Sequence, residues 1–376
     1  MVFQRIRDFF FLRIIAPGLF RIDIPGYVIG RFSLLGLMNN YIFARNVFIP
    51  ETFFENLEAE VIKKQGEEGK NALYRIGKQF GFRFAELYHT SRGDIPRSMA
   101  AITHFFETLY AEKIESSIDL NEKMLTLLTE DMAVTRKDGG GYCLTIGGCA
   151  GIWAYLIDDY TVECTIRKTS DRRYEFKSAP SPILAVKGSG DLIICNEKPK
   201  AHSFDAYKLH NSPPFKIPSS ALNMQKLMQT ELFTLNKSEL DFAITDNRFV
   251  PVELFVLFEI ERIFDEETVY RAAHDSFRDI GSKVKHQNPL MFISEILTAF
   301  GFGIADMLGE GNERIIIFHG YPWLDMQYEK TDFAVLKGAI TGFLEGVTKR
   351  KYRIIQVQSG MAGNKFEVRV TVGGEN

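Results

Sequence analysis

This 376-residue sequence has few cysteines and no excess of positive charge. No close pair of cysteines has the two-residue gap of a zinc ribbon, so we expect free thiols in a reduced, cytoplasmic compartment. A net charge of −3 gives no basis for binding the phosphate backbone, so we expect no nucleic-acid partner. The sequence also lacks a nucleotide-binding fingerprint and a recognisable Ser-His-Asp pattern. The four cysteines are Cys143, Cys149, Cys164 and Cys195.

The first 40 residues lack an uninterrupted apolar run, although they are both basic and apolar. They carry five arginines against two aspartates. The arginines, together with Pro17 and Pro25, exclude a transmembrane helix, which needs about 20 consecutive apolar residues. A cleavable signal peptide also fits poorly, because Arg13 interrupts the apolar run. Two interpretations remain: an arm that contacts a membrane surface or a protein partner, and a segment that packs on its own domain, which we favour.

The second half of the chain repeats the first. Phe48-Ile49-Pro50 recurs 201 positions later as Phe249-Val250-Pro251. Tyr74-Arg75 recurs as Tyr270-Arg271, and near the end of each half a tyrosine precedes an aromatic-Glu-apolar-basic tetrad by 14 residues. Drift of the offset is expected where loops change length and elements are retained. We therefore predict an N-terminal arm (1–40), a first domain (41–178), a structured connector (179–242) and a second domain (243–376).

Hydrophobic periodicity predicts helices followed by strands in each repeat. This order is typical of an α+β domain, in which a helical layer packs on a small antiparallel sheet. The predicted helices are 51–64, 70–88, 98–114, 147–158, 252–264, 267–284, 290–308 and 331–348. The predicted strands are 160–168, 173–178, 314–318, 352–358 and 365–372. In the connector we predict an apolar hairpin, 183–186 with 192–195, and a helix at 220–235, which pack between the repeats or extend one of their sheets.

Two segments carry a resemblance to a known family. They are the glycine-marked stretch 338–346 with the hairpin that follows it, and the helix 74–81 of the first repeat. Both are similar to the 4-vinyl reductase domain family, so the chain resembles two divergent tandem copies. The resemblance implies a small-molecule-binding fold, shared with the sensory domains of aromatic-responsive activators and with transport protein particle subunits that hold an acyl chain. Because family members often dimerise, a tandem copy implies a pseudo-dimer within one chain.

The sequence departs from this family in its closing hairpin. Many members carry paired cysteines there, often read as metal ligands, whereas residues 356–366 contain none. The first repeat offers only Cys164 near the corresponding position. We therefore expect no zinc and no metal site, and the sequence does not identify a cofactor.

The candidate ligand-binding residues are large aromatic side chains and the polar groups beside them. The two matched arginines are suited to holding a ligand carboxylate, although a surface ion pair with a helix neighbour is the simpler interpretation. Two acidic pairs, Glu58 with Glu60 and Glu259 with Glu261, lie on early helix turns, and we expect them to be solvated. The candidates are Tyr74, Arg75, Phe80, Trp153, Tyr270, Arg271, Phe300, His319, Trp323 and Phe343.

Three classes of function fit these patterns. The first is non-catalytic binding of a small hydrophobic or aromatic ligand, such as a hydrocarbon, an acyl chain or a tetrapyrrole, by a sensor or carrier. The second is a scaffold that assembles a protein complex or acts at a membrane surface. The third is an enzyme that modifies a tetrapyrrole, against which stands the lack of an evident proton donor. We expect a binding module without catalytic residues.

Overall fold

The computed structural model describes residues 20–32, 42–87, 91–133, 142–187, 191–192, 221–229, 233–236, 239–242, 247–308, 313–323, 331–362 and 365–374. The structure is α+β. The chain divides into two compact units. The C-terminal unit takes its described residues from 1–31, 43–56 and 204–376, and the central unit takes its own from 32–42 and 57–203.

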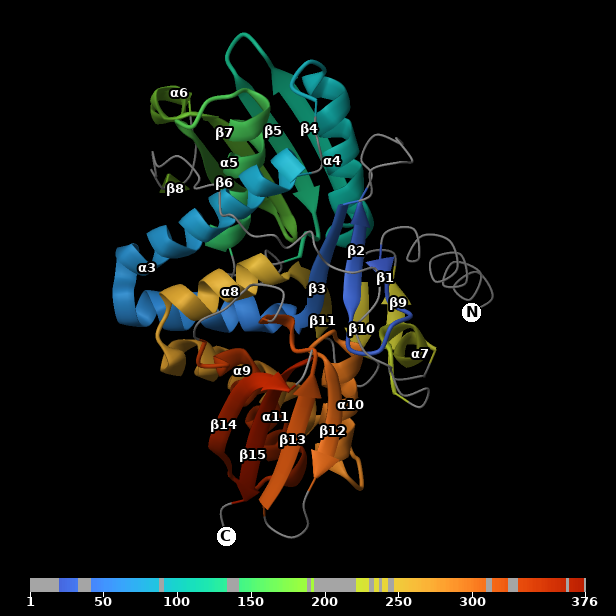
Figure 1. Ribbon diagram of the computed structural model, residues 1–376. Coiled ribbons are helices and arrows are strands. Elements are labelled where there is room, and N and C mark those ends of the chain that lie inside the picture. Colours follow the sequence, from blue (N-terminus) through green and yellow to red (C-terminus); the bar gives the residue numbers. More distant parts are fainter. Residues whose placement is uncertain are drawn as a thin grey trace. The chain divides into compact units, whose positions relative to one another are not determined.

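The central unit holds a five-stranded antiparallel sheet with helices packed on it (Figure 1). Its strand order is β4-β5-β7-β6-β8, and α5 packs against β6 and β7. The two-residue strand β8, from the connector, pairs with β6 at Thr165 and Ile166, so this part of the connector extends a sheet, one of the two alternatives that the sequence left open. The elements are most of α3 (Glu51–Leu87), α4 (Ile95–Leu109), β4 (Lys113–Asp119), β5 (Met124–Glu130), α5 (Tyr142–Leu156), β6 (Val162–Ser170), β7 (Arg173–Pro180), α6 (Ser181–Lys187) and β8 (Asp191–Leu192).

The C-terminal unit holds a four-stranded and a six-stranded sheet. The four-stranded sheet has the order β12-β13-β15-β14, and α10 and α11 contact it while α9 packs on α11 (Figure 1). The six-stranded sheet has the order β1-β2-β3-β11-β10-β9. The elements are β1 (Phe20–Arg21), β2 (Val28–Phe32), β3 (Ile42–Pro50), α7 (Met224–Met228), β9 (Phe233–Asn236), β10 (Glu239–Phe242), β11 (Arg248–Glu253), α8 (Leu254–Ile263), α9 (Glu266–Ser282), α10 (Pro289–Ala299), β12 (Ile304–Leu308), β13 (Glu313–His319), α11 (Ala334–Thr348), β14 (Tyr352–Ala362) and β15 (Lys365–Gly374).

The two sequence repeats have the same order of elements. Helix α3 is kinked at Gly66, which has a non-helical φ of 57°, so it corresponds to the pair α8 and α9. Each repeat then runs strand, two helices, a third helix, two strands, a closing helix and two strands. The strand order β4-β5-β7-β6 of the first repeat matches β12-β13-β15-β14 of the second. Two segments of one chain with the same order of elements and strands support the internal duplication.

The repeated Phe-apolar-Pro motifs form paired strands within the C-terminal unit. Strands β3 and β11 are antiparallel, with Ile49 opposite Val250. The guanidinium of Arg248 on β11 donates two hydrogen bonds to the carboxylate of Glu51, at 2.7 and 3.1 Å, and both side chains are buried. A bidentate charge-assisted pair of this kind fixes the start of α3 against the sheet.

In each repeat, glycines allow the closing helix, α5 or α11, to pack closely on the long helix before it, α3 or α9. A Cβ on Gly147 of α5 would lie 2.1 Å from the carbonyl oxygen of Tyr74. In the second repeat, a Cβ on Gly342 of α11 would lie 2.1 Å from the carbonyl oxygen of His274. Any larger residue would force the backbones apart, so these glycines set the depth of the helix crossing.

Part of the predicted N-terminal arm belongs to the core of the C-terminal unit. Tyr27 and Ile29 are buried, and Gly26 exchanges backbone hydrogen bonds with Thr298 and Gly303. The guanidinium of the buried Arg45 lies 4.0 Å from the ring centroid of Tyr27. Its Nη2 donates to the carbonyl oxygens of Gly26, Gly301 and Gly320 at 3.1, 3.2 and 2.6 Å. This stretch therefore packs within the chain, but mainly against residues of the second repeat, so the expectation of a segment packed on its own domain is borne out only in part. Residues 1–19 and 33–40 lie outside the described part of the chain.

Several predicted elements were wrong in type or extent. Residues 183–186, predicted as a strand, lie in helix α6, and the predicted helix 220–235 is the short α7 followed by β9. The predicted helices 98–114 and 290–308 end at Leu109 and Ala299, and strands β4 and β12 begin within the predicted spans. Within the described ranges, no helix has both the length and the apolar character required to cross a membrane.

Candidate functional site

Helices α3 and α4 of the central unit, with the residue that caps the C-terminus of α4, carry a cluster of five aromatic rings. Phe84 is at its centre, with ring centroids 6.0 Å from Phe80, 5.4 Å from Phe105 and 5.3 Å from Phe106. Tyr110 lies 5.5 Å from Phe106. All of these distances are in the range of favourable tilted ring contacts.

Local sequence explains why these rings gather. Phe80 and Phe84 are one turn apart on α3, so they share a face. Helix α4 begins at an N-cap aspartate, Asp94, whose carboxylate accepts a hydrogen bond from the backbone of Arg97, and it carries adjacent phenylalanines in its last turns. The cap fixes where α4 starts and therefore which of its side chains face α3.

The aromatic cluster has buried rings, which we call its floor, and half-buried rings, which we call its rim. Phe84 and Phe105 are buried, whereas Phe80, Phe106 and Tyr110 are only half-buried. Half-buried rings contribute apolar surface that a further apolar molecule would remove from water, at about 25 cal/mol per Å². The aromatic cluster is therefore suited to contact an apolar or aromatic molecule at its rim.

A buried polar network joins helix α3 to strand β6 in the central unit. Glu163 of β6 accepts hydrogen bonds from the hydroxyl of Tyr74 and, at 3.0 Å, from the ammonium of Lys78. All three side chains are at most 2% exposed. Burial and the neighbouring carboxylate raise the pKa of Tyr74 well above its usual value, so its hydroxyl stays protonated and donates. The three groups satisfy one another, which is typical of a structural network.

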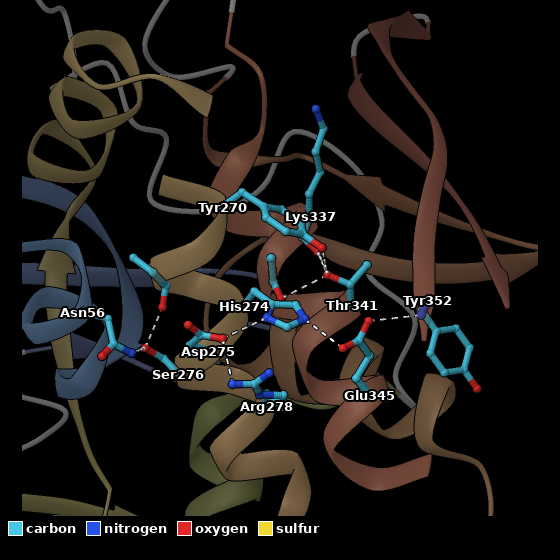
Figure 2. Close-up of polar contacts among 12 residues, drawn as sticks. Asn56, Tyr270, His274, Asp275, Ser276, Arg278, Lys337, Thr341, Glu345 and Tyr352 are labelled. Atoms are coloured by element: carbon cyan, nitrogen blue, oxygen red, sulfur yellow. Dashed lines mark hydrogen bonds and ion pairs between the residues drawn. The ribbon is translucent and has the colours of Figure 1, made fainter. Parts of the chain in front are cut away.

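The second repeat has a more open polar network between helices α9 and α11, which Figure 2 shows. Tyr270 and His274 stand one turn apart on α9, as Tyr74 and Lys78 do on α3. The ring of His274 lies between two carboxylates: Nε2 is 3.1 Å from Glu345 Oε2, and Nδ1 is 3.1 Å from Asp275 Oδ1. The hydroxyl of Tyr270 lies 2.9 Å from that of Thr341.

This second network reaches the surface. The side chains of His274 and Glu345 are 13% and 20% exposed, and that of Asp275 is 50% exposed. Glu345 also accepts a hydrogen bond from the backbone of Tyr352, which links the closing helix to β14. The position four residues after the matched tyrosine therefore differs between the repeats. It is the buried Lys78 in the first repeat and the partly exposed His274 in the second.

A buried glutamate accepts hydrogen bonds from the first turn of the closing helix in each repeat. Glu58 accepts from the backbone of Cys143 at 3.0 Å, at the start of α5. Glu261 accepts from Val335 at 2.9 Å, at the start of α11, and from the indole of Trp323 at 3.0 Å. Burial raises the pKa of Glu58, and it raises the pKa of Glu261 to about 7. These contacts suit a helix N-terminus, whose free N–H groups favour a carboxylate.

The prediction of solvated acidic pairs is therefore wrong for three of the four glutamates. Glu58, Glu259 and Glu261 are at most 8% exposed. Only Glu60 is partly open, and it pairs with Lys63. The sequence did not reveal this burial, because the spacing of apolar residues along a helix cannot distinguish a glutamate that caps another helix from one on the solvated face.

The predicted ligand-binding residues lie at separate places. In the central unit, Phe80 is in the aromatic cluster, Tyr74 is in the polar network and Arg75 is exposed. Trp153 is buried on α5, and its indole donates to the carbonyl oxygen of Lys123 at 2.8 Å. None of these placements tests binding, so the four residues stay predictions.

In the C-terminal unit, Arg271 forms an ion pair with Glu267, which confirms the simpler interpretation of this arginine. His319, the last residue of β13, lies 2.9 Å from Asp306 and 2.8 Å from Glu367. The other four candidates are part of ring or hydrogen-bond contacts. They are Tyr270 against His274, Phe300 against Phe48 and Phe249, Trp323 against Phe258 and Tyr321, and Phe343 against Phe292.

Sequence reasoning missed most of the aromatic cluster. Phe84, Phe105, Phe106 and Tyr110 were not among the candidates, although the adjacent phenylalanines near the end of a predicted helix were a usable signal. His274 was missed as well, because a single histidine on a long helix has no distinguishing neighbours in sequence.

The cysteines and acidic residues form no metal centre in the described part of the chain. Cys143, Cys149 and Cys164 are buried free thiols, as the sequence predicts. Cys195 lies outside the described residues. No family model matches this chain, and no curated protein matches it either.

Proposed function

We propose that this chain is a non-catalytic binding protein whose first repeat holds a small apolar or aromatic molecule against the aromatic cluster. The observation that carries this proposal is the contact between a buried floor, Phe84 and Phe105, and a half-buried rim of three rings. A planar or acyl ligand would cover the rim and bury aromatic surface at low entropic cost to the protein, because aromatic side chains have few rotatable bonds.

The sealed polar network of the central unit supports binding over catalysis there. Tyr74, Lys78 and Glu163 are sealed and bonded to one another, so none presents a reactive group to a substrate. The buried glutamates, Glu58 and Glu261, hold helix N-termini. These are structural roles, and they leave apolar contact as the chemistry that the central unit offers to a ligand.

We also propose that the chain belongs to the 4-vinyl reductase domain family as two tandem copies. The shared order of elements and strands in the two repeats supports the tandem duplication in this proposal. The pairing of Ile49 with Val250, its counterpart in the other repeat, supports a pseudo-dimeric origin for the strand pair. Three buried unpaired thiols support a cytoplasmic location.

The test is a titration with 1-aminoanthracene, a fluorescent aromatic probe, followed by displacement with unlabelled hydrocarbons and fatty acids. Phe106→Ala removes one rim ring and should weaken binding roughly tenfold, by losing apolar contact area. Tyr352→Ala, which removes a half-buried ring of the second repeat, is the matched control and should bind as the wild type does. Equal binding by both variants, or no binding by the wild type, would overturn the proposal.

A further inference from the structure

The turn that joins α11 to β14 is strongly basic. It reads Lys349-Arg350-Lys351-Tyr352-Arg353, and all four of its cationic residues are exposed. Among the described residues, none of these four side chains has an ion-pair partner. The chain as a whole carries a net charge of −3, so the positive charge at this turn is a local excess. A local excess of this kind attracts an anionic partner.

The first repeat shows that the fold does not require positive charge at this turn. The matching turn after α5 reads Asp158-Asp159-Tyr160, against Arg350-Lys351-Tyr352 after α11. The two aspartates pair with Arg92 and Lys123, at 2.9 and 3.4 Å. A cation suits a helix C-terminus, but α5 ends beside two carboxylates, so this preference does not explain the basic turn. The charge is therefore paired within the chain in one repeat, and it is reversed and unpaired in the other.

The turn belongs to a larger basic surface at one end of the second repeat. Helices α9 and α11 end side by side, since a Cβ on Gly346 would lie 2.7 Å from the backbone nitrogen of Ser282. The segment that follows α9 adds the exposed Lys285. We call this surface the basic end, and its cationic residues are Lys285, Lys349, Arg350, Lys351 and Arg353.

The carboxylates that α9 and α11 carry near the basic end are already engaged. Asp279 pairs with Lys283 at 3.0 Å, and Glu345 lies 3.1 Å from His274. Neither carboxylate is left to neutralise the five cations.

Three exposed apolar side chains lie at the same end. Strand β12 ends there with Leu308, and β14 begins there shortly before Ile355, because neighbouring strands of this sheet are antiparallel (Figure 1). Met291 is in the first turn of α10, beside Phe292, whose ring lies 5.7 Å from that of Phe343 in the second half of α11. The three side chains are 52%, 44% and 40% exposed in the order named.

We propose that the basic end docks on a membrane surface that contains anionic phospholipids. Its cations would contact lipid phosphates, and its apolar side chains would enter the layer beneath the headgroups, as in other proteins that bind at the membrane interface. A nucleic acid also offers phosphates, but its charged backbone gives Leu308, Ile355 and Met291 no apolar layer to enter. This surface lies in the second repeat and is independent of the proposed ligand site.

The test is flotation of the full chain with vesicles of equal parts phosphatidylserine and phosphatidylcholine, and with vesicles of phosphatidylcholine alone. The wild type should bind the first and not the second, and added salt should weaken the binding. Arg350→Asp combined with Lys351→Asp copies the turn of the first repeat, so the variant should fold. It should bind at least about twentyfold more weakly, because each basic residue strengthens binding roughly fivefold.

A second pair of lysines gives the control for charge. Lys63→Asp combined with Lys64→Asp makes the same change in net charge at exposed positions of α3, and it should bind as the wild type does.

A leucine pair tests the apolar contact. Leu308→Ser should weaken binding to the anionic vesicles roughly tenfold, because this side chain no longer leaves water. Leu120→Ser, at a turn of the central unit where the leucine is 51% exposed, is the matched control and should bind as the wild type does.

Matching thermal unfolding midpoints for all variants exclude loss of folding as the cause. The proposal is overturned by a wild type that does not bind the anionic vesicles, even if it binds RNA or heparin. Wild-type binding by the variant with both Arg350→Asp and Lys351→Asp, or equal binding by the two leucine variants, would overturn it as well.

Discussion

Ile49 on β3 lies directly opposite Val250 on β11, the residue that occupies the same place in the other repeat. Their neighbours obey the same relation, since Phe48 lies opposite Pro251 and Pro50 opposite Phe249. The register is therefore symmetric about one residue pair. A strand pair with this symmetry is what the fusion of two identical pairing strands would leave behind.

The helix crossings should be intolerant of added volume at single positions. Gly147→Ala would place a methyl group 2.1 Å from the carbonyl oxygen of Tyr74, and we expect it to lower the free energy of unfolding by about 3 kcal/mol. Denaturant unfolding measures this.

The neighbouring glycine on α5 gives the matched control. A Cβ on Gly148 would meet only the carbonyl oxygen of Gly77, at 4.0 Å. Gly148→Ala should therefore be neutral or should stabilise the protein by about 0.5–1 kcal/mol, because alanine favours a helix. Equal effects at Gly147 and Gly148 would show that close approach does not set the crossing.

The buried pair of Lys78 and Glu163 should show strong coupling. Lys78→Met leaves a buried carboxylate without its cation, and Glu163→Gln leaves a buried ammonium without its anion. Each change should cost about 3–5 kcal/mol of stability. The double variant should cost much less than the sum, because neither uncompensated charge remains.

A double-mutant cycle by denaturant unfolding measures this coupling. Lys63→Met and Glu60→Gln form the control cycle, since that pair is part-exposed, with side chains 67% and 21% exposed. Its coupling should be at most about 1 kcal/mol. Additive effects of Lys78→Met and Glu163→Gln would contradict the structural role given to the sealed network.

Glu261 should make the stability of the protein fall as the pH rises through neutrality. Its pKa is about 7 in the folded chain because of burial, against an ordinary value of 4.5. Between these values the folded state binds more protons than the unfolded state, so the stabilising contribution is complete below pH 4.5 and is lost as the pH approaches and passes 7. The full span corresponds to about 3 kcal/mol.

Thermal unfolding midpoints measured between pH 5 and pH 8 test this dependence, because that range covers most of the interval between the ordinary pKa of Glu261 and its pKa in the folded chain. Glu261→Gln cannot titrate, so it should lose most of the slope while keeping the fold. Glu60→Gln, which removes a part-exposed carboxylate of the first repeat, should keep the wild-type slope. The same slope in all three proteins would assign the pH dependence to other groups.

The repeats and the α+β class could be predicted from the sequence because they depend on periodic apolar residues and on matched motifs. The ends of helices were harder to predict. The apolar spacing of 290–308 continues through Phe300 and Phe302, but Gly301 and Gly303 adopt a φ of 97° and end the helix. Residues at such φ values are usually glycine, yet glycine within an apolar run does not by itself reveal that it will break the helix.

Other errors have equally local causes. Strand β4 is mostly exposed, with half-buried residues only at Ile114 and Ile118, and it has little apolar content, so the sequence showed no period-two pattern there. Helix α6 was read as a strand from its apolar run, although Pro182 in its first turn favours a helix start. The aromatic cluster depends on how α3 meets α4, and a tertiary contact of that kind has no signature along either helix alone.

The most direct test of the central claim is native mass spectrometry of the purified wild-type chain beside Phe106→Ala, followed by denaturing extraction of anything that remains bound. The account predicts that the wild-type protein carries an apolar or aromatic molecule, or takes up 1-aminoanthracene in an amount equal to that of the chain. Phe106→Ala should lose most of the bound molecule or probe. A wild-type mass equal to that of the bare chain, unchanged after incubation with the probe, would contradict the assignment of the aromatic cluster as a binding site.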